Sequence, residues 1–505
     1  MEDARQRQAE VILAMHNQDL GHTVDTQRPI EALPKETPIG WVPPEILSLF
    51  FIFAKPFDLA YCIPSRRRPP LIFLQVCSLW RTVALATPDL WTDLCISLRD
   101  SSLQWKPAAL DNLAAQWFSR AGPHARLSLQ FEDHISPNHR YDFSNIILSR
   151  SERFRQLKIS FLITSSLATF IRGDGNASST FSQLEEITIP RERGMDIRFA
   201  AAGCLRRMTL EICFDAWEEM KSFAPWEQLT YLEIRSSVYE AAWVSLLSQC
   251  INLENGTFRI YPCDRDPVPT VNVTMAHLTS LNMRFGWTSS IQLFDGFRFP
   301  ALTSLHIEPG RNFSWRHPEH FYDQLGSLRT LSFVGTSMEL VNLLRHTPSL
   351  VALHARTNTH LDPLLLALTA TNESDPLVPA LKHLTIQTTR WTVSTPSGGP
   401  LVTMIASRTR HFDAYGWQLE HLTIVVPIVE RHGDDSLELG RQLRDLDMSM
   451  VREFHRPLSG SRGGGTVVEY VWRQAGSQAS GSRGPFRGMT YFSVFHHFQY
   501  PSLVA

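Results

Sequence analysis

The feature that most restricts the fold is a short pattern, apolar-x-x-apolar-x-apolar, which returns about every 24 residues. One copy alone could be an amphipathic strand of any α/β fold. Successive copies from 205 to 350 begin 24, 24, 25, 24, 26 and 22 residues apart, and this regularity predicts an array of similar units. The copies, including a weaker one at 253, are Leu205/Met208/Leu210, Leu229/Leu232/Ile234, Leu253/Gly256/Phe258, Leu278/Leu281/Met283, Leu302/Leu305/Ile307, Leu328/Leu331/Phe333, Leu350/Leu353/Ala355, Leu381/Leu384/Ile386 and Leu419/Leu422/Ile424.

The pattern continues towards the N-terminus with steps of 33, 30, 30 and 21 residues, and downstream steps of 31 and 38 residues predict inserted loops. The upstream copies are Trp91/Leu94/Ile96, His124/Leu127/Leu129, Phe154/Leu157/Ile159 and Leu184/Ile187/Ile189. Apolar residues at helical spacing over 240–253 and 337–350 predict helices between strands. The period and core resemble leucine-rich repeats, which implies an irregular α/β solenoid with parallel strands over 101–430. Side chains between the leucines would line its concave face, among them Arg235, Arg259, Arg284, His306, Glu308 and His354.

Length and composition restrict the class of protein further. A chain of 505 residues exceeds what one core supports, so we expect several units or an elongated array. The 48 basic and 50 acidic residues give a net charge of -2, which predicts no general attraction to nucleic acid or to an anionic membrane. The seven cysteines are scattered without a C-x-x-C pair, which argues against a disulfide framework and a zinc site. With no signal-like or membrane-spanning stretch, we expect a cytoplasmic or nuclear location.

The N-terminal region contains an unusually apolar helix candidate. "PPEILSLFFIFA" begins with two prolines and a glutamate, which suit the first turn of a helix. Apolar residues then cover every face of that helix: Ile46, Leu47, Leu49, Phe50, Phe51, Ile52 and Phe53. A second apolar helical stretch follows over 71–88. Because two short helices cannot bury all of these residues between them, a neighbouring domain or a separate protein should cover the rest.

This region resembles the F-box of proteins abundant in mushroom-forming fungi. "PPEIL" is followed about thirty residues later by "VCSLWRTVALATPDLW", and the similarity covers about Ile39 to Ser97. The resemblance implies a small helical domain that docks onto the Skp-type adaptor of a cullin-RING ubiquitin ligase, which would cover the apolar surface. The chain departs from the family at Val42, where leucine is usual, and in an upstream "ALPKETP".

The resulting functional prediction is a substrate-recognition subunit of an SCF-type ubiquitin ligase. Its F-box would bind the adaptor, and through it a cullin, while the repeats present a protein substrate. The predicted adaptor-binding or adaptor-shaping residues are Pro44, Ile46, Leu47, Phe50, Val76, Trp80 and Arg81. No phosphate loop, nucleophile elbow or metal motif occurs, so a non-catalytic protein without cofactor or metal is expected.

Three alternatives remain open. The apolar residues of the helical region could be plain core, or the F-box could be decayed in a protein-interaction scaffold with no ligase role. An enzyme built on a repeat scaffold would need convergent catalytic residues that one sequence does not reveal.

Four segments follow from this interpretation: a flexible segment at 1–38, the F-box at 39–100, the solenoid at 101–430, and a C-terminal cap with a flexible Gly/Ser/Arg-rich tail at 431–505. Within the last segment, 432–454 is predicted to form a capping helix, and "TVVEYVW" is predicted to be a strand.

Overall fold

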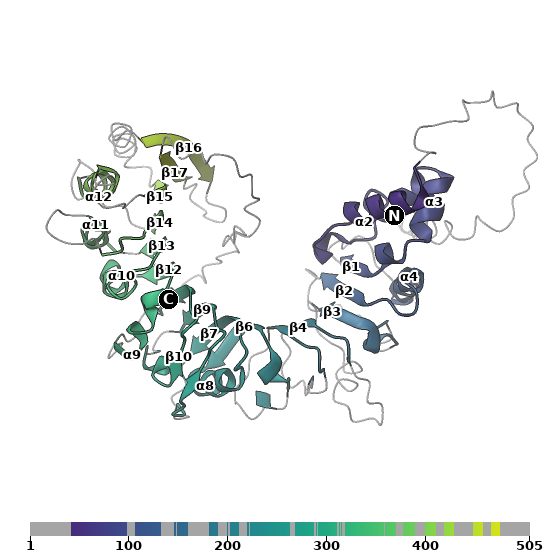
Figure 1. Ribbon diagram of the computed structural model, residues 1–505, viewed down its shortest axis with the longest axis horizontal. Helices are drawn as coiled ribbons and strands as arrows, with labels where there is room; N and C mark the ends of the chain where they lie inside the picture. The colour runs from purple at the N-terminus through teal and green to yellow at the C-terminus, as the bar shows by residue number, and fades with distance from the viewer. Residues whose placement is uncertain are drawn as a thin grey trace, which may run out of the picture. The chain divides into compact units, whose positions relative to one another are not determined.

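A computed structural model describes most of the chain between residues 42 and 474 (Figure 1). The described residues are 42–97, 107–132, 146–147, 149–159, 181–189, 199, 202–211, 220–221, 223–262, 268–286, 289, 291–310, 313, 315, 319–357, 359–369, 377–388, 399–410, 419–428, 448–457 and 466–474. The predicted flexible segment at 1–38 lies outside them. The chain divides into two compact units: unit 1 comprises Met1–Cys213 and Glu218–Pro225, and unit 2 comprises Phe214–Trp217 and Trp226–Ala505.

Unit 2 is built on parallel strands that follow the predicted repeat. Neighbouring strands pair in chain order, and each predicted copy from 229 to 419 supplies one of them. The strands are β6 (Tyr231–Tyr239), β7 (Asn255–Tyr261), β9 (Ser280–Phe285), β11 (Ser304–Glu308), β12 (Thr330–Gly335), β13 (Ala352–Thr357), β14 (His383–Thr388) and β15 (His421–Ile428). The second apolar position of each unit aligns across the sheet: Leu281, Leu305, Leu331, Leu353, Leu384 and Leu422 are successive partners. The prediction of an α/β fold with parallel strands is therefore confirmed.

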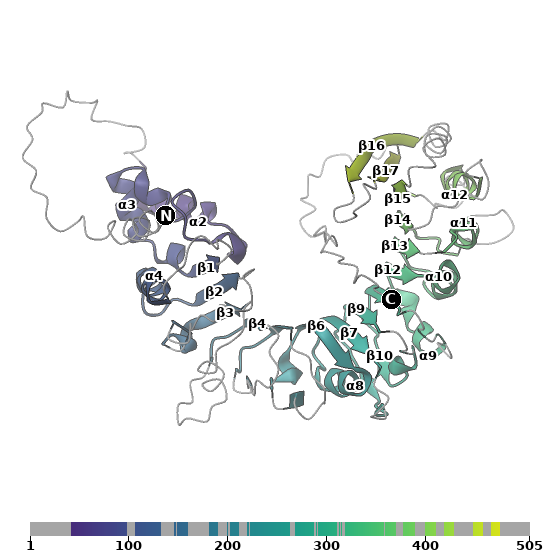
Figure 2. The same cartoon turned by 180° about the vertical axis from the view of Figure 1, so that it is seen from behind.

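Helices connect these strands and lie along one side of them (Figures 1 and 2). They are α8 (Glu240–Gln249), α9 (Glu319–Tyr322), α10 (Ser337–Leu344), α11 (Asp362–Leu368) and α12 (Gly399–Arg410), with short turns η6 (Trp226–Gln228), η7 (Ile291–Phe294) and η8 (Leu325–Ser327). The predicted helices at 240–253 and 337–350 are confirmed as α8 and α10. A capping box starts α10: the Thr336 hydroxyl accepts the Glu339 N–H, and the Glu339 carboxylate accepts the Thr336 N–H.

Two further features complete unit 2. A small pair of parallel strands, β8 (Val273–Thr274) and β10 (Phe297–Arg298), lies outside the main sheet. In α12 the Arg408 side chain is buried, and it donates to the carbonyls of Leu368 at 2.8 Å and Val378 at 3.0 Å. Because Leu368 ends α11, the guanidinium lies at the negative end of a helix dipole.

The last strands of unit 2 run antiparallel. β15 pairs with β17 (Thr466–Gln474), which pairs with β16 (Met448–Pro457). The strand predicted for "TVVEYVW" is confirmed, but the helix predicted over 432–454 is wrong at 448–454, where β16 lies; residues 432–447 are outside the described ranges. The second edge of β17 needs hydrogen-bond partners, and this pairing outweighs the weak helical preference of the segment.

Unit 1 contains five parallel strands in chain order: β1 (Asp93–Ser97), β2 (Leu127–Glu132), β3 (Phe154–Lys158), β4 (Glu186–Ile189) and β5 (Arg207–Leu210). Leu129 of β2 pairs with both Leu94 and Leu157. The copy that matches its neighbours is therefore Arg126/Leu129/Phe131, and the predicted frame at His124 is two residues too early. A two-residue shift leaves the same side chains on the same face, so the apolar pattern alone could not separate the two frames.

Short helices precede and follow β1: α2 (Pro44–Ala54), η2 (Leu59–Tyr61), η3 (Phe73–Gln75), α3 (Ser78–Leu85) and η4 (Pro88–Trp91) before it, and α4 (Pro107–Arg120) after it, while η5 (Ser151–Arg153) leads into β3. The helix predicted over 71–88 is interrupted at Cys77, whose backbone is extended with φ -158°. The Cys77 sulfur accepts the N–H of Trp80 and so starts α3 as an N-cap. β1 belongs to the sheet although it falls inside the predicted segment 39–100.

Candidate functional site

The candidate site is a face of α2, and the local sequence determines where this helix begins and ends. Pro44 occupies the first turn, where a missing N–H costs nothing, and Glu45 lies near the positive end of the helix dipole. The helix ends at Ala54, because Lys55 is extended ahead of Pro56.

Apolar residues on α2 fall into two stripes with opposite exposure. Leu47 and Phe51, one turn apart, are buried and form the inner stripe. The outer stripe is exposed and consists of Ile46 (45%), Leu49 (49%), Phe50 (63%) and Phe53 (75%). At about 100° per residue, these four side chains span an arc of about 100°, which is the width of a helix face made for packing.

The inner stripe holds α2 against the rest of the N-terminal helices. The Phe51 ring stacks on Phe73 at 4.2 Å between centroids and lies 5.0 Å from Trp80. The Ser48 and Thr87 hydroxyls are 2.9 Å apart and join α2 to the turn between α3 and η4. α2 is therefore held by its inner stripe, and its outer stripe is left facing outward.

Further large apolar side chains of the same helical region are exposed. They are Phe57, Tyr61, Ile72, Val76 and Leu85. Exposed aliphatic and aromatic residues occur singly on most proteins, but a whole helix face accompanied by several neighbours is typical of an interaction surface.

The helical region is attached firmly to β1. The Lys55 ammonium lies 2.7 Å from the Asp93 carboxylate, and the Cys95 N–H of β1 donates to the Cys62 carbonyl at 3.0 Å. Trp91 is fully buried, and its indole N–H donates to the Ala84 carbonyl at 2.9 Å. These helices thereby cover the outer edge of β1, an edge that would otherwise expose unpaired backbone groups.

Trp91 also contacts α4. The Trp117 ring lies 5.0 Å from the Trp91 ring, and the Arg120 guanidinium lies over Trp91 at 4.5 Å. Burial lowers the pKa of Arg120 from its usual value, as expected for a cation packed on an aromatic face. The tryptophan of "TPDLW" therefore contributes to the attachment of the helices rather than to their exposed surface.

The seven adaptor-binding residues predicted from sequence differ in their exposure in the structure. Pro44, Ile46, Phe50, Val76 and Arg81 are exposed, Leu47 is buried in the inner stripe, and Trp80 is half-buried. The Arg81 guanidinium donates to the Leu74 carbonyl at 2.9 Å, which links α3 to η3. Sequence reasoning missed Leu49 and Phe53 as site residues, although both lie one turn or less from Phe50 on the same helix face.

The predicted concave-face residues of unit 2 are on the sheet face away from the helices. Arg284 pairs with Glu308 at 3.3 Å, and Arg235 pairs with Glu233 at 2.9 Å, while Arg259 is exposed. Because the arginines of these ion pairs are exposed, each pair is expected to contribute little to stability.

His306 on β11, Ser332 on β12 and His354 on β13 are register partners on three adjacent strands. The His306 Nδ1 lies 2.7 Å from the Ser332 hydroxyl. Burial, followed by Arg284 and His354, lowers the pKa of His306 to about 4, and burial also lowers the pKa of His354. Both shifts favour the neutral form of the imidazole.

No protein-family model matches this chain, and a search of the curated proteins finds no match. Over the ranges that the structure describes, no three His, Cys, Asp or Glu side chains gather in a way that could hold a metal ion. In the same ranges, no helix is both long and apolar enough to span a bilayer.

Proposed function

We propose that the protein is the substrate-recognition subunit of an SCF-type cullin-RING ubiquitin ligase. The observation that carries the proposal is the outer stripe of α2, an apolar helix face left exposed in the segment whose sequence resembles an F-box. Because burial of such a face in a partner stabilises a complex through a few large anchors, a Skp-type adaptor is a suitable partner.

The outer stripe would supply most of the adaptor contact, with Phe50 and Phe53 as its largest side chains. Ile46 and Leu49 would flank them, and Val76 would add an exposed aliphatic contact from the segment before α3. Leu47 and Trp80 would act indirectly, by holding α2 in place.

The proposed mechanism is proximity without catalysis by this chain. The helical region would bind the adaptor and thereby a cullin, and the leucine-rich-repeat-like strands would hold a protein substrate. Bringing substrate lysines close to a ubiquitin-loaded enzyme raises their effective concentration and requires no catalytic side chain here.

The test is co-purification of the full chain with a Skp-type adaptor, comparing the wild type with Phe50→Asp/Phe53→Asp. The matched control is Leu366→Asp, since Leu366 on α11 of unit 2 is 62% exposed and Phe50 is 63% exposed. We expect the wild type and the control to retain the adaptor and the double variant to lose it, with unchanged circular dichroism in all three.

A second candidate is a protein-interaction scaffold whose F-box no longer binds an adaptor. The departure at Val42 favours it. A wild-type chain that is folded but retains no adaptor would refute the ligase role and leave this candidate.

A further inference from the structure

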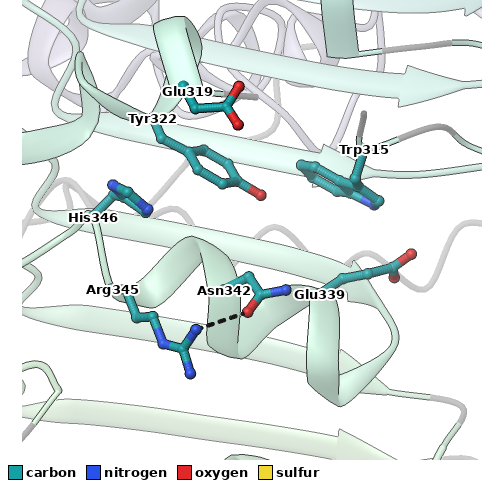
Figure 3. A pocket seen from close by; sticks show the side chains of 7 residues that line it. All are labelled: Trp315, Glu319, Tyr322, Glu339, Asn342, Arg345 and His346. Carbon is teal, nitrogen blue, oxygen red and sulfur yellow. Dashed lines mark hydrogen bonds between the residues drawn. The ribbon is translucent and has the colours of Figure 1, made fainter. Parts of the chain in front are cut away.

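A small pocket lies on the helical side of unit 2, between α9 and α10. It has a volume of about 240 Å³, below the roughly 300–1,000 Å³ typical of sites for cofactors and drug-sized ligands. Its lining residues are Trp315, Glu319, Tyr322, Glu339, Asn342, Arg345 and His346 (Figure 3). A pocket of this size suits one chemical group or one side chain.

Aromatic rings form one part of the pocket. The Trp315 and Tyr322 rings lie 6.4 Å apart between centroids, and the Tyr322 and His346 rings lie 4.6 Å apart. Tyr322 is buried against the protein, and Figure 3 shows its hydroxyl directed towards Trp315. Faces of tryptophan and tyrosine carry partial negative charge and attract cations.

Two carboxylates complete the site, and they lie on opposite sides of the Trp315 and Tyr322 rings (Figure 3). Glu339 uses one oxygen, Oε2, for both of its bonds to Thr336 in the capping box, which leaves Oε1 available. Glu319 is exposed, and its carboxylate forms no hydrogen bond or ion pair within the described part of the chain.

The electrostatics of the pocket favour a cation over an anion. Burial, followed by Glu339 and Glu319, raises the pKa of Tyr322 to about 12, so both carboxylates act on the ring at the centre of the pocket. The one lining guanidinium, Arg345, donates to Asn342 at 3.3 Å at the far end from Trp315 (Figure 3). An anion would meet two carboxylates, whereas an ammonium group would meet carboxylates and aromatic faces together.

We propose that this pocket, the Trp315 pocket, binds a single alkylammonium group, namely the side chain of a lysine residue on a bound protein. The ammonium would donate to the Glu319 carboxylate, Glu339 would add negative charge from the other side of the rings, and the methylene chain would pack on Trp315 and Tyr322. A lysine fits the pocket because it combines a compact charge with an apolar stem. The site lies in unit 2 and does not depend on adaptor binding, so it goes beyond the proposed function.

The experiment follows Trp315 directly in the full chain labelled with 5-fluorotryptophan. The ¹⁹F resonance of Trp315 is assigned by its loss in Trp315→Phe. N-acetyl-lysine methylamide is titrated at neutral pH beside N-acetyl-norleucine methylamide, which has the same shape without the ammonium. We expect a saturable shift of the Trp315 resonance with the lysine compound alone, with a dissociation constant on the order of millimolar for a group of this size.

Two variants test the role of the carboxylates. Glu319→Gln should weaken binding of the lysine compound about two- to five-fold, as expected for a partly exposed ion pair. The control Glu254→Gln changes an exposed carboxylate that does not line the pocket, and it should leave the affinity unchanged.

Three results would overturn the proposal. They are an equal shift with the norleucine compound, equal affinity in the two glutamine variants, and no shift with either compound. Putrescine separates the two sources of an alkylammonium group, because tighter binding of this free diamine than of the lysine compound would contradict a protein-borne ligand. Loss of adaptor binding in the co-purification test would leave all of these outcomes unaffected.

Discussion

Lys55 is the residue by which the attachment of α2 to β1 can be tested most sharply. Its ammonium lies 2.6 Å from the Asp89 carbonyl, 2.8 Å from the Thr92 hydroxyl and 2.7 Å from the Asp93 carboxylate. The side chains of Lys55 and Asp93 are only 13% and 20% exposed. Lys55→Met keeps the length of the side chain, but it removes the charge and all three contacts.

The magnitude follows from this burial. Removing one partner of a fully buried ion pair costs about 3–5 kcal/mol, because the other charge remains unpaired. Here Asp93 is slightly exposed and retains Arg155 at 4.0 Å, so about 2–3 kcal/mol is expected. Lys382 and Glu420 of unit 2 form a matched control pair, also 2.7 Å apart, but with side chains 52% and 35% exposed. Lys382→Met should therefore cost about 0.2–1 kcal/mol.

The assay is native-state hydrogen exchange, because a chain built from repeats need not unfold in one step. In Lys55→Met, protection of the amides in 44–62 and of Cys95 should fall about 30- to 150-fold, which corresponds to 2–3 kcal/mol. Exchange in β12 to β14 should be unchanged. The control variant should change protection near its own site by about five-fold at most.

Equal effects of the two lysine variants would refute the reasoning, because the two pairs have the same distance and differ in burial. Loss of protection in β12 to β14 of Lys55→Met would also refute it, since the attachment would then not be local to unit 1.

Three further predictions concern unit 2. The pKa of His306 is lowered from 6.5 to about 4, so the unfolded chain binds more protons than the folded chain between these pH values. The stability of the wild type should therefore fall as the pH drops through this window, by about 1–2 kcal/mol from pH 7 to 5. Thermal melting of His306→Gln should lack this pH-dependent loss of stability. Gly310→Ala should destabilise by about 1–3 kcal/mol in denaturant unfolding, because a Cβ would overlap the Gly286 carbonyl oxygen, whereas Gly326→Ala meets open space and should be nearly neutral. Arg408→Lys should lower the melting temperature, with a loss of about 1–3 kcal/mol, because a lysine ammonium lacks the rigid planar fork by which the guanidinium donates to both carbonyls; an unchanged melting curve would contradict this.

The strands were predictable because the same apolar pattern recurs in the sequence once for each strand. Leu305, Leu331 and Leu353 occupy the same register position in consecutive strands, and their spacing in the sequence already indicated this. Where the spacing was irregular, as at His124, the frame slipped by two residues, since strand periodicity is two and no neighbouring copy corrected it.

The candidate site was predictable only as a region. The sequence shows that α2 is apolar on every face, but it does not show which face packs inward. That choice depends on Phe73 and Trp80, which follow Phe51 by more than twenty residues and meet it only in the folded chain. The Trp315 pocket was missed for the same reason, because its carboxylates belong to two helices and resemble ordinary surface residues in the sequence.

The division of α2 into two stripes determines which variants can test the proposed function. A change at Leu47 or Trp80 removes packing within unit 1, so a loss of adaptor binding in such a variant would not separate contact from unfolding. A change at Phe50 leaves that packing intact, and 63% of a side chain of about 200 Å² gives about 125 Å² that a partner could cover. At about 25 cal/mol per Å², Phe50→Ala should weaken an adaptor complex by up to about 3 kcal/mol, measurable by calorimetry. The same substitution should leave hydrogen exchange of α2 nearly unchanged, because the exposed ring contributes little to folding. A variant that loses both binding and protection would show that the outer stripe supports the fold and is not a docking face.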